Sequence, residues 1–158
     1  MTEQDKKFMR RAFELAQNGI DANNGGPFGA VVVRDGVIVG EGCNRVTSTN
    51  DPTAHAEVVA IREACKNLNS FQLDDCTIYT SCEPCPMCLG AIYWARPALM
   101  YFACSREDAA NAGFDDDFIY EEIALPVEER RIKTVNFMRE EGLQIFENWV
   151  NKPDKTEY

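Results

Sequence analysis

Two short clusters contain the residue types that bind a metal ion and move protons. His55-Ala56-Glu57 is the first, and it holds the single histidine of the chain; Pro84-Cys85-Pro86-Met87-Cys88 is the second. Zinc binds imidazole nitrogen and thiolate sulfur tetrahedrally, and catalytic zinc sites keep one position for water. Cys85 and Cys88 are three residues apart, so on a helix both sulfurs lie on one face. We therefore predict a zinc ion bound by His55, Cys85 and Cys88.

Glu57 follows His55 by two residues, near the start of a predicted helix. From there its carboxylate can reach a metal-bound water without binding the metal, and it can pass a proton to a ring nitrogen and then to a departing amine. The order His-x-Glu followed by Pro-Cys-x-x-Cys matches the signature of zinc deaminases. One alternative stays open: Cys82 could be a fourth ligand, which would make this a zinc-stabilised interaction module without activity.

Hydrophobic periodicity and breaker residues predict the elements that position these clusters. Helices are predicted at residues 5–20, 53–68, 84–95 and 139–151, and strands at 28–33, 37–40, 76–80, 98–103 and 132–137. Asp35-Gly36 predicts a hairpin turn, and Asp51 before Pro52 is the expected N-cap of the second helix. Strands joined through helices run parallel, so we expect one α/β domain over residues 1–158, with a mixed sheet and helices on both faces.

Composition limits the partners and the compartment. The net charge is −10, and residues 107–158 carry 14 acidic and 6 basic side chains. This negative charge repels nucleic acid and anionic lipid, so neither is an expected partner. No stretch has the roughly 18 apolar residues of a membrane span, and the N-terminus lacks a secretory signal. Seven cysteines then indicate reduced thiols and a cytoplasmic location; we interpret Cys43, Cys65, Cys76 and Cys104 as small apolar core residues.

The motifs resemble a known family. His55-Ala-Glu57 and Glu83-Pro-Cys-Pro-Met-Cys88 look like the cytidine deaminase-like superfamily, and the run from Thr80 to Pro97 is similar to the small bacterial guanine deaminases. Further likeness lies in Gly25-Gly-Pro-Phe-Gly-Ala30, Ala112-Gly-Phe-Asp-Asp116 and Glu157-Tyr158. The resemblance covers essentially the whole chain. It implies a three-layer α/β/α fold around a five-stranded sheet, a homodimer, and zinc-dependent hydrolysis of guanine to xanthine and ammonia.

The resemblance also indicates which residues would bind the base. Phe28 is the expected stacking ring, and Asn44 can offer both N–H and C=O to a ring edge. Asp116 could accept purine N–H protons or assist proton transfer to the leaving amine. Tyr158 looks like a lid residue that would exclude water. Each also has a simpler interpretation: Phe28 as core, Asn44 and Asp116 as loop residues, and Tyr158 as a frayed terminus.

A second enzymatic interpretation shares the same zinc chemistry. Transfer-RNA adenosine deaminases carry a nearly identical zinc signature, and cytosine-type deaminases use the same zinc chemistry. A polyanionic substrate needs several Lys or Arg contacts to its phosphates, and the charge of −10 therefore favours a free neutral base.

Overall fold

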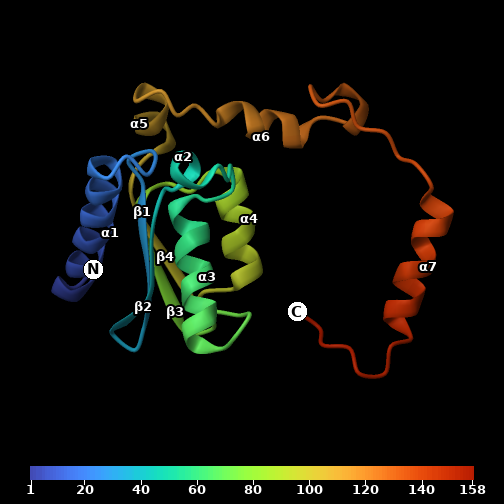
Figure 1. Cartoon of the computed structure of the whole chain (residues 1–158), viewed down its shortest axis with the longest axis horizontal. Helices are drawn as coiled ribbons and strands as arrows, with labels where there is room; N and C mark the ends of the chain where they lie inside the picture. Colours follow the sequence, from blue (N-terminus) through green and yellow to red (C-terminus); the bar gives the residue numbers. More distant parts are fainter. The chain divides into compact units, whose positions relative to one another are not determined.

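A four-stranded mixed sheet is the centre of residues 1–117 in the computed structural model, which describes residues 1–158 (Figure 1). Its strands are β1 (Gly29–Arg34), β2 (Val37–Cys43), β3 (Cys76–Cys82) and β4 (Leu99–Cys104), in the order β2-β1-β3-β4. β1 pairs antiparallel with β2 and β3, whereas β3 and β4 run parallel. β2 and β3, which are joined through a helix, therefore point the same way, as expected from the sequence.

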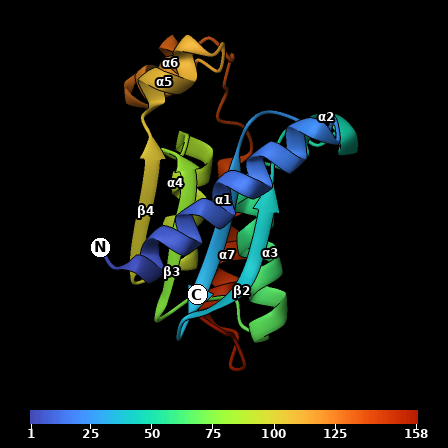
Figure 2. The same cartoon turned by 90° about the vertical axis from the view of Figure 1, so that its left-hand side faces the viewer.

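Helices cover both faces of this sheet, and Figure 2 shows α1 on one side with α3 and α4 on the other. These helices are α1 (Glu3–Asp21), α3 (Ala56–Leu68) and α4 (Pro86–Ala95). Successive residues of β1 point to opposite faces of the sheet and pack against different helical layers. Val31 and Val33 pack in one core cluster with Phe8 of α1, and Ala30 and Val32 pack in another with residues of α3 and α4. The predicted arrangement of a mixed sheet between helical layers is thus confirmed.

Two glycines of β2 allow α3 to lie directly against the sheet. A Cβ atom at Gly40 would stand 2.4 Å from the carbonyl oxygen of Ala60, and one at Gly42 would stand 2.1 Å from that of Ala56. No side chain fits at either place without moving the helix. Because Ala56 directly follows His55, the contact at Gly42 sets the depth of the helix end that carries the predicted metal ligand.

Residues 118–158 form a second unit, which is described by itself. It holds most of α6 (Asp117–Ala124), a short 3-10 helix, η1 (Val127–Glu129), and α7 (Arg139–Val150), and none of its residues is buried. The strand predicted at 132–137 is absent, so the sheet has four strands and the five-stranded prediction is wrong. A strand needs a partner for its main-chain groups, and this unit contains no other strand.

Other differences from the predictions are local. The helix predicted to start at residue 53 begins at Ala56, and its N-cap is His55 rather than Asp51. Asp51 instead accepts hydrogen bonds from the backbone N–H and the hydroxyl of Thr53, at 2.8 and 2.7 Å, so it forms a local turn. Cys104, interpreted as a core residue, is exposed. No helix of the structure is both long and apolar enough to cross a membrane.

Candidate active site

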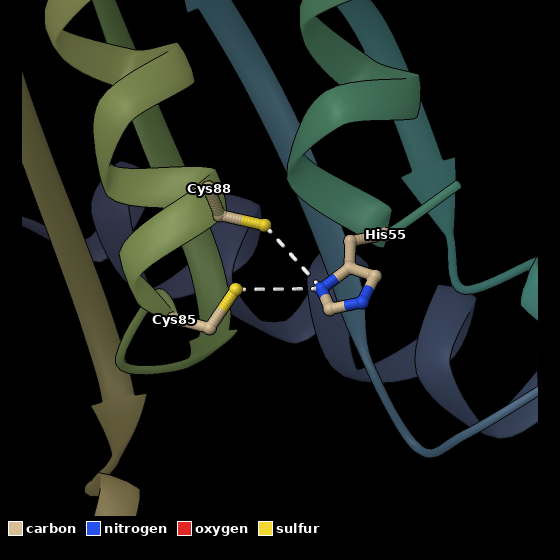
Figure 3. A group of neighbouring side chains, drawn as sticks. All are labelled: His55, Cys85 and Cys88. Atoms are coloured by element: carbon tan, nitrogen blue, oxygen red, sulfur yellow. Dashed lines mark hydrogen bonds between the residues drawn. The ribbon is translucent and has the colours of Figure 1, made fainter. Parts of the chain in front are cut away.

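His55 and Cys85 occupy equivalent places in two helices, since each is an N-cap residue (Figure 3). Their backbones are extended, with φ, ψ of −70°, 155° and −64°, 167°. Cys88 is the third residue of α4 and is fully buried. Two helix N-termini therefore meet at these three side chains, and the unpaired N–H groups of such ends stabilise thiolates.

The three side chains converge on one point. The Nδ1 atom of His55 lies 3.6 Å from the Cys85 sulfur and 3.5 Å from the Cys88 sulfur, and all ligand atoms lie within 4.8 Å of one another (Figure 3). Zinc bonds of about 2.3 Å to sulfur and about 2.0–2.1 Å to nitrogen, at tetrahedral angles, separate such atoms by about 3.6 Å. The donor set and its spacing therefore fit zinc.

Hydrogen bonds among the three residues favour the thiolate form of Cys85, and a divalent cation binds cysteine as the thiolate. The pKa of Cys85 is lowered to about 4, first by its hydrogen bond with the Cys88 thiol and then by that with His55. The pKa of Cys88 is raised, mainly because it shares that hydrogen bond with Cys85 and is buried. The pKa of His55 is raised by the hydrogen bond to Cys85. These hydrogen bonds therefore favour the thiolate form of Cys85, which is the form that binds zinc.

The fourth position of this group is not filled by a protein side chain. Cys82 does not belong to the group, and its thiol contacts the carbonyl oxygen of Ser105 at 3.4 Å instead. Glu57, the second residue of α3, is buried beside the group, and this burial raises its pKa. The three ligands therefore leave the fourth coordination position to a non-protein ligand, and a carboxylate lies beside them. This is the arrangement of a catalytic zinc centre rather than of a structural one.

A cavity of about 360 Å³ lies over these residues, within the range of small-molecule sites. It brings together most of the predicted site residues, namely Phe28, Asn44, His55, Glu57, Cys85 and Asp116. Cys88 lies behind the cavity wall. Tyr158 belongs to residues 118–158, and its part in the site stays a prediction.

Asn44 is held in one orientation by the main chain around it. The side-chain Oδ1 of Asn44 accepts a hydrogen bond from the backbone N–H of Val46 at 3.1 Å. The backbone N–H of Asn44 donates to the carbonyl oxygen of Phe28 at 3.0 Å. Gly25 packs so tightly here that a Cβ atom would stand 2.1 Å from Oδ1. With Oδ1 engaged, the amide N–H groups are the part of Asn44 that can donate to a ligand.

Some residues that line the cavity had no role assigned from the sequence, among them Phe114, Glu83 and Arg106. Phe114 meets Phe28 edge to face, with ring centroids 5.0 Å apart, and widens the aromatic wall. Glu83 accepts the backbone N–H of Arg106, 3.2 Å away, so the loop before Cys85 is tied to the start of α5 (Arg106–Asn111). The Gly113-Phe114-Asp115-Asp116 run was a sequence signal for the contact between Phe114 and Phe28. The contact between Glu83 and Arg106 joins two segments that no local sequence pattern relates.

Asp116 stands at the cavity on the segment that follows α5. Its side chain is half-buried, and desolvation raises its pKa. Four carboxylates line the cavity, those of Glu57, Glu83, Asp115 and Asp116, against the guanidinium of Arg106 and the imidazole of His55. The cavity therefore disfavours a phosphate-bearing ligand.

Comparison with known proteins agrees with this geometry. Residues 2–104 match the model of the cytidine and deoxycytidylate deaminase zinc-binding region. Over 151 residues the chain is 60% identical to the guanine deaminase of Bacillus subtilis (strain 168), covering 96% of this chain and 97% of that protein. The crystal structure of guanine deaminase from Bacillus subtilis superposes with a TM-score of 0.95 at 59% identity, over 97% of this chain and 98% of the other.

More distant relatives are also similar to this chain. A solved structure of guanine deaminase from Nitrosomonas europaea has a TM-score of 0.66 at 34% identity, over 69% of this chain and 63% of that one. A tRNA-specific adenosine deaminase of Buchnera aphidicola subsp. Schizaphis graminum is 34% identical over 92% of this chain and 93% of its own length.

Proposed function

Because the chain belongs to the zinc-binding cytidine and deoxycytidylate deaminase family, we propose that it hydrolyses guanine to xanthine and ammonia. The observation that carries the proposal is the cavity, in which an open His-Cys-Cys group, a buried carboxylate, an aromatic wall and a fixed amide meet. Relatives named guanine deaminase are similar to this chain over nearly its full length, which supports the choice of base.

Proton transfer falls to Glu57. Zinc, when bound by His55, Cys85 and Cys88, supplies a water that ionises near neutral pH. The Glu57 carboxylate would take one proton from that water and pass it to a ring nitrogen of the base as the water oxygen bonds to the ring carbon. It would then take the remaining proton of that oxygen, which becomes the carbonyl oxygen, and deliver it to the amino group that leaves as ammonia. Its burial excludes bulk water, so the proton stays within the site.

Binding of the flat base is assigned to the cavity walls. Phe28 and Phe114 offer an aromatic wall for stacking, and Asn44 donates N–H to an acceptor on the ring edge. Asp116 accepts N–H protons of the purine or assists the leaving amine, and Tyr158 closes over the bound base. The roles of Phe28, Asn44, Asp116 and Tyr158 rest on residue chemistry together with the resemblance to guanine deaminases. That of Phe114 rests on its contact with Phe28.

The quaternary state and the compartment belong to the same proposal. A homodimer is supported by large apolar side chains exposed on α4 and β4, those of Tyr93, Leu99 and Phe102. Sedimentation velocity at micromolar concentration tests it, and a single monomeric species would contradict it. A reducing compartment, the cytoplasm, is supported by the seven free cysteines.

A substrate panel tests the reaction. Zinc-loaded protein is incubated with guanine, adenine, cytosine, their nucleosides and an RNA stem-loop, while ammonia and the product base are measured. We expect xanthine from guanine and little turnover of the others. Activity on adenosine in RNA without activity on guanine would replace this proposal by an RNA-editing function, the second interpretation of the signature.

A further inference from the structure

Gly25 is half-buried and packs against the side chain of Asn44. A Cβ atom at position 25 would stand 2.1 Å from the Oδ1 atom of Asn44 and 3.0 Å from its backbone carbonyl oxygen. The glycines with a positive φ are Gly36 and Gly113, so a left-handed backbone is not the reason for a glycine at position 25. The missing side chain at this position therefore makes room for the amide of Asn44.

The loop around this glycine is fixed on both sides by hydrogen bonds of Asn24. The backbone N–H of Asn24 donates at 2.9 Å to a carbonyl oxygen near the end of α1. Its carbonyl oxygen accepts the hydroxyl of Thr47 at 2.9 Å and the backbone N–H of Ser48 at 3.1 Å, and both residues belong to α2 (Val46–Thr49). Because the loop is tied to two helices, an added Cβ atom displaces the side chain of Asn44 more easily than it displaces the loop.

The Oδ1 atom of Asn44 is held in place from two directions. Gly25 leaves the space that this atom occupies, and the backbone N–H of Val46 donates to it at 3.1 Å. The amide N–H groups are then the part of the side chain left for a ligand in the cavity. A rotated amide would break the hydrogen bond with Val46 and would change the direction in which its N–H groups donate.

We propose that Gly25 is a positioning residue for base binding, because it keeps the Asn44 amide in the orientation that donates N–H to the ring edge of the base. This role rests on the proposed function, in which Asn44 binds guanine through that amide. Gly26 lines the cavity and Gly25 does not, so Gly25 acts on the base through Asn44.

Gly26 provides a matched comparison in the same loop. A Cβ atom there would stand 2.9 and 3.0 Å from two ring atoms of Phe114 and 3.0 Å from one of Phe28, and none of these three nearest atoms belongs to Asn44. Gly26→Ala therefore disturbs the aromatic wall, whereas Gly25→Ala disturbs the amide.

A double-mutant cycle with the zinc-loaded full chain tests the role of Gly25 through kcat and KM for guanine. Gly25→Ala should raise KM by about three- to tenfold and leave kcat within about twofold, because it weakens one hydrogen bond to the bound base. In the Asn44→Ala background, which has no Oδ1 atom, the same substitution should change kcat/KM by less than about twofold. Gly26→Ala should lower kcat/KM by a similar factor in both backgrounds.

Amide hydrogen exchange at Val46 gives a second readout, which needs no substrate. Its backbone N–H is bonded to the Oδ1 atom of Asn44, so Gly25→Ala should speed its exchange by about tenfold or more, as Asn44→Ala does. Gly26→Ala should leave this rate within about threefold of the wild type.

Three results would overturn the role of Gly25: a wild-type KM in Gly25→Ala, an equal loss in both Asn44 backgrounds, or unchanged exchange at Val46. If Gly25→Ala does not fold, the double variant with Asn44→Ala should fold, since the 3.0 Å contact with the backbone carbonyl then remains as the close one. An unfolded double variant would also overturn the role. Absence of guanine turnover would overturn the proposed function, whereas the exchange at Val46 would still support or overturn the contact between Gly25 and Asn44.

Discussion

Residues 1–117 and residues 118–158 differ in how they are held together. The first unit contains every buried residue and all lining residues of the cavity, and its strands are covered by helices on two faces. The second has no buried residue, and Ile132 and Phe137 expose about four-fifths of their surface, 80% and 81%. Chemistry that needs ångström precision is thus placed where packing from both sides leaves little freedom.

The largest expected effect is removal of a metal ligand in the first unit. His55→Ala, Cys85→Ala and Cys88→Ala should each release zinc and abolish activity, since three ligands are the minimum of a catalytic site. Metal content after dialysis, with turnover of guanine, measures this. A full zinc equivalent in all three variants would contradict the ligand set.

Glu57→Gln should come next. The amide keeps the size of the side chain but accepts no proton, so zinc and fold should remain while kcat falls by about 10²–10⁴-fold. Turnover measures the loss of kcat, and zinc content and circular dichroism show whether the metal and the fold remain. Unchanged kcat would remove Glu57 from the reaction.

A matched pair of truncations tests the contrast in packing itself. Val32→Ala in β1 removes two fully buried methyl groups and should lower the free energy of unfolding by about 2 kcal/mol. Val135→Ala, in the exposed segment, should change it by less than about 0.5 kcal/mol. Urea unfolding measures both. Equal losses would break the comparison, because they would show that Val135 is covered in the assembled protein.

Deleting Tyr158 asks whether the second unit takes part in the chemistry. As a closing residue it should raise KM or lower kcat by about three- to tenfold, while the melting temperature shifts by no more than about 2 °C, because the residue is exposed. Steady-state kinetics and thermal melting separate the two. Unaltered kinetics would remove Tyr158 from the active site.

The smallest effect concerns an ion pair. Arg11 donates to both oxygens of Glu41, at 2.7 and 2.8 Å, and these bonds lower the pKa of Glu41. Glu41→Gln should therefore cost about 1 kcal/mol at pH 7, a difference that shrinks as the pH falls below about 4 and the wild-type carboxyl is protonated. Glu140→Gln is the control, because its pair with Arg139 is exposed. Equal losses in the two variants would contradict the assigned role of the Arg11 pair.

Local signals predicted the first unit well. The Asp35-Gly36 turn, the apolar strand runs and the proline at the start of α4 act between near neighbours, and each element that they predicted is present. The same holds for the metal group, whose residue types and spacing lie within two short segments. Such features depend on a few adjacent residues, so a sequence displays them directly.

Features that depend on distant partners were missed. The segment 132–137 has strand-like residues but no strand to pair with, so composition alone misled the prediction. His55 is an N-cap because Asp51 is engaged in its own turn, and the amide of Asn44 is oriented partly by Gly25, nineteen positions earlier. The contact between Glu83 and Arg106 likewise joins two segments that only the fold brings together.

The glycines of β2 affect the reaction because they set how closely α3 lies against the sheet. Positions 40 and 42 act as a spacer of fixed thickness between the sheet and α3, and the first turn of that helix carries both a metal ligand and the proton carrier. A single methyl group added at position 42 would lift that turn away from the sheet and from the cysteines of α4. Residue size in the interior of a strand therefore affects catalytic alignment as well as stability.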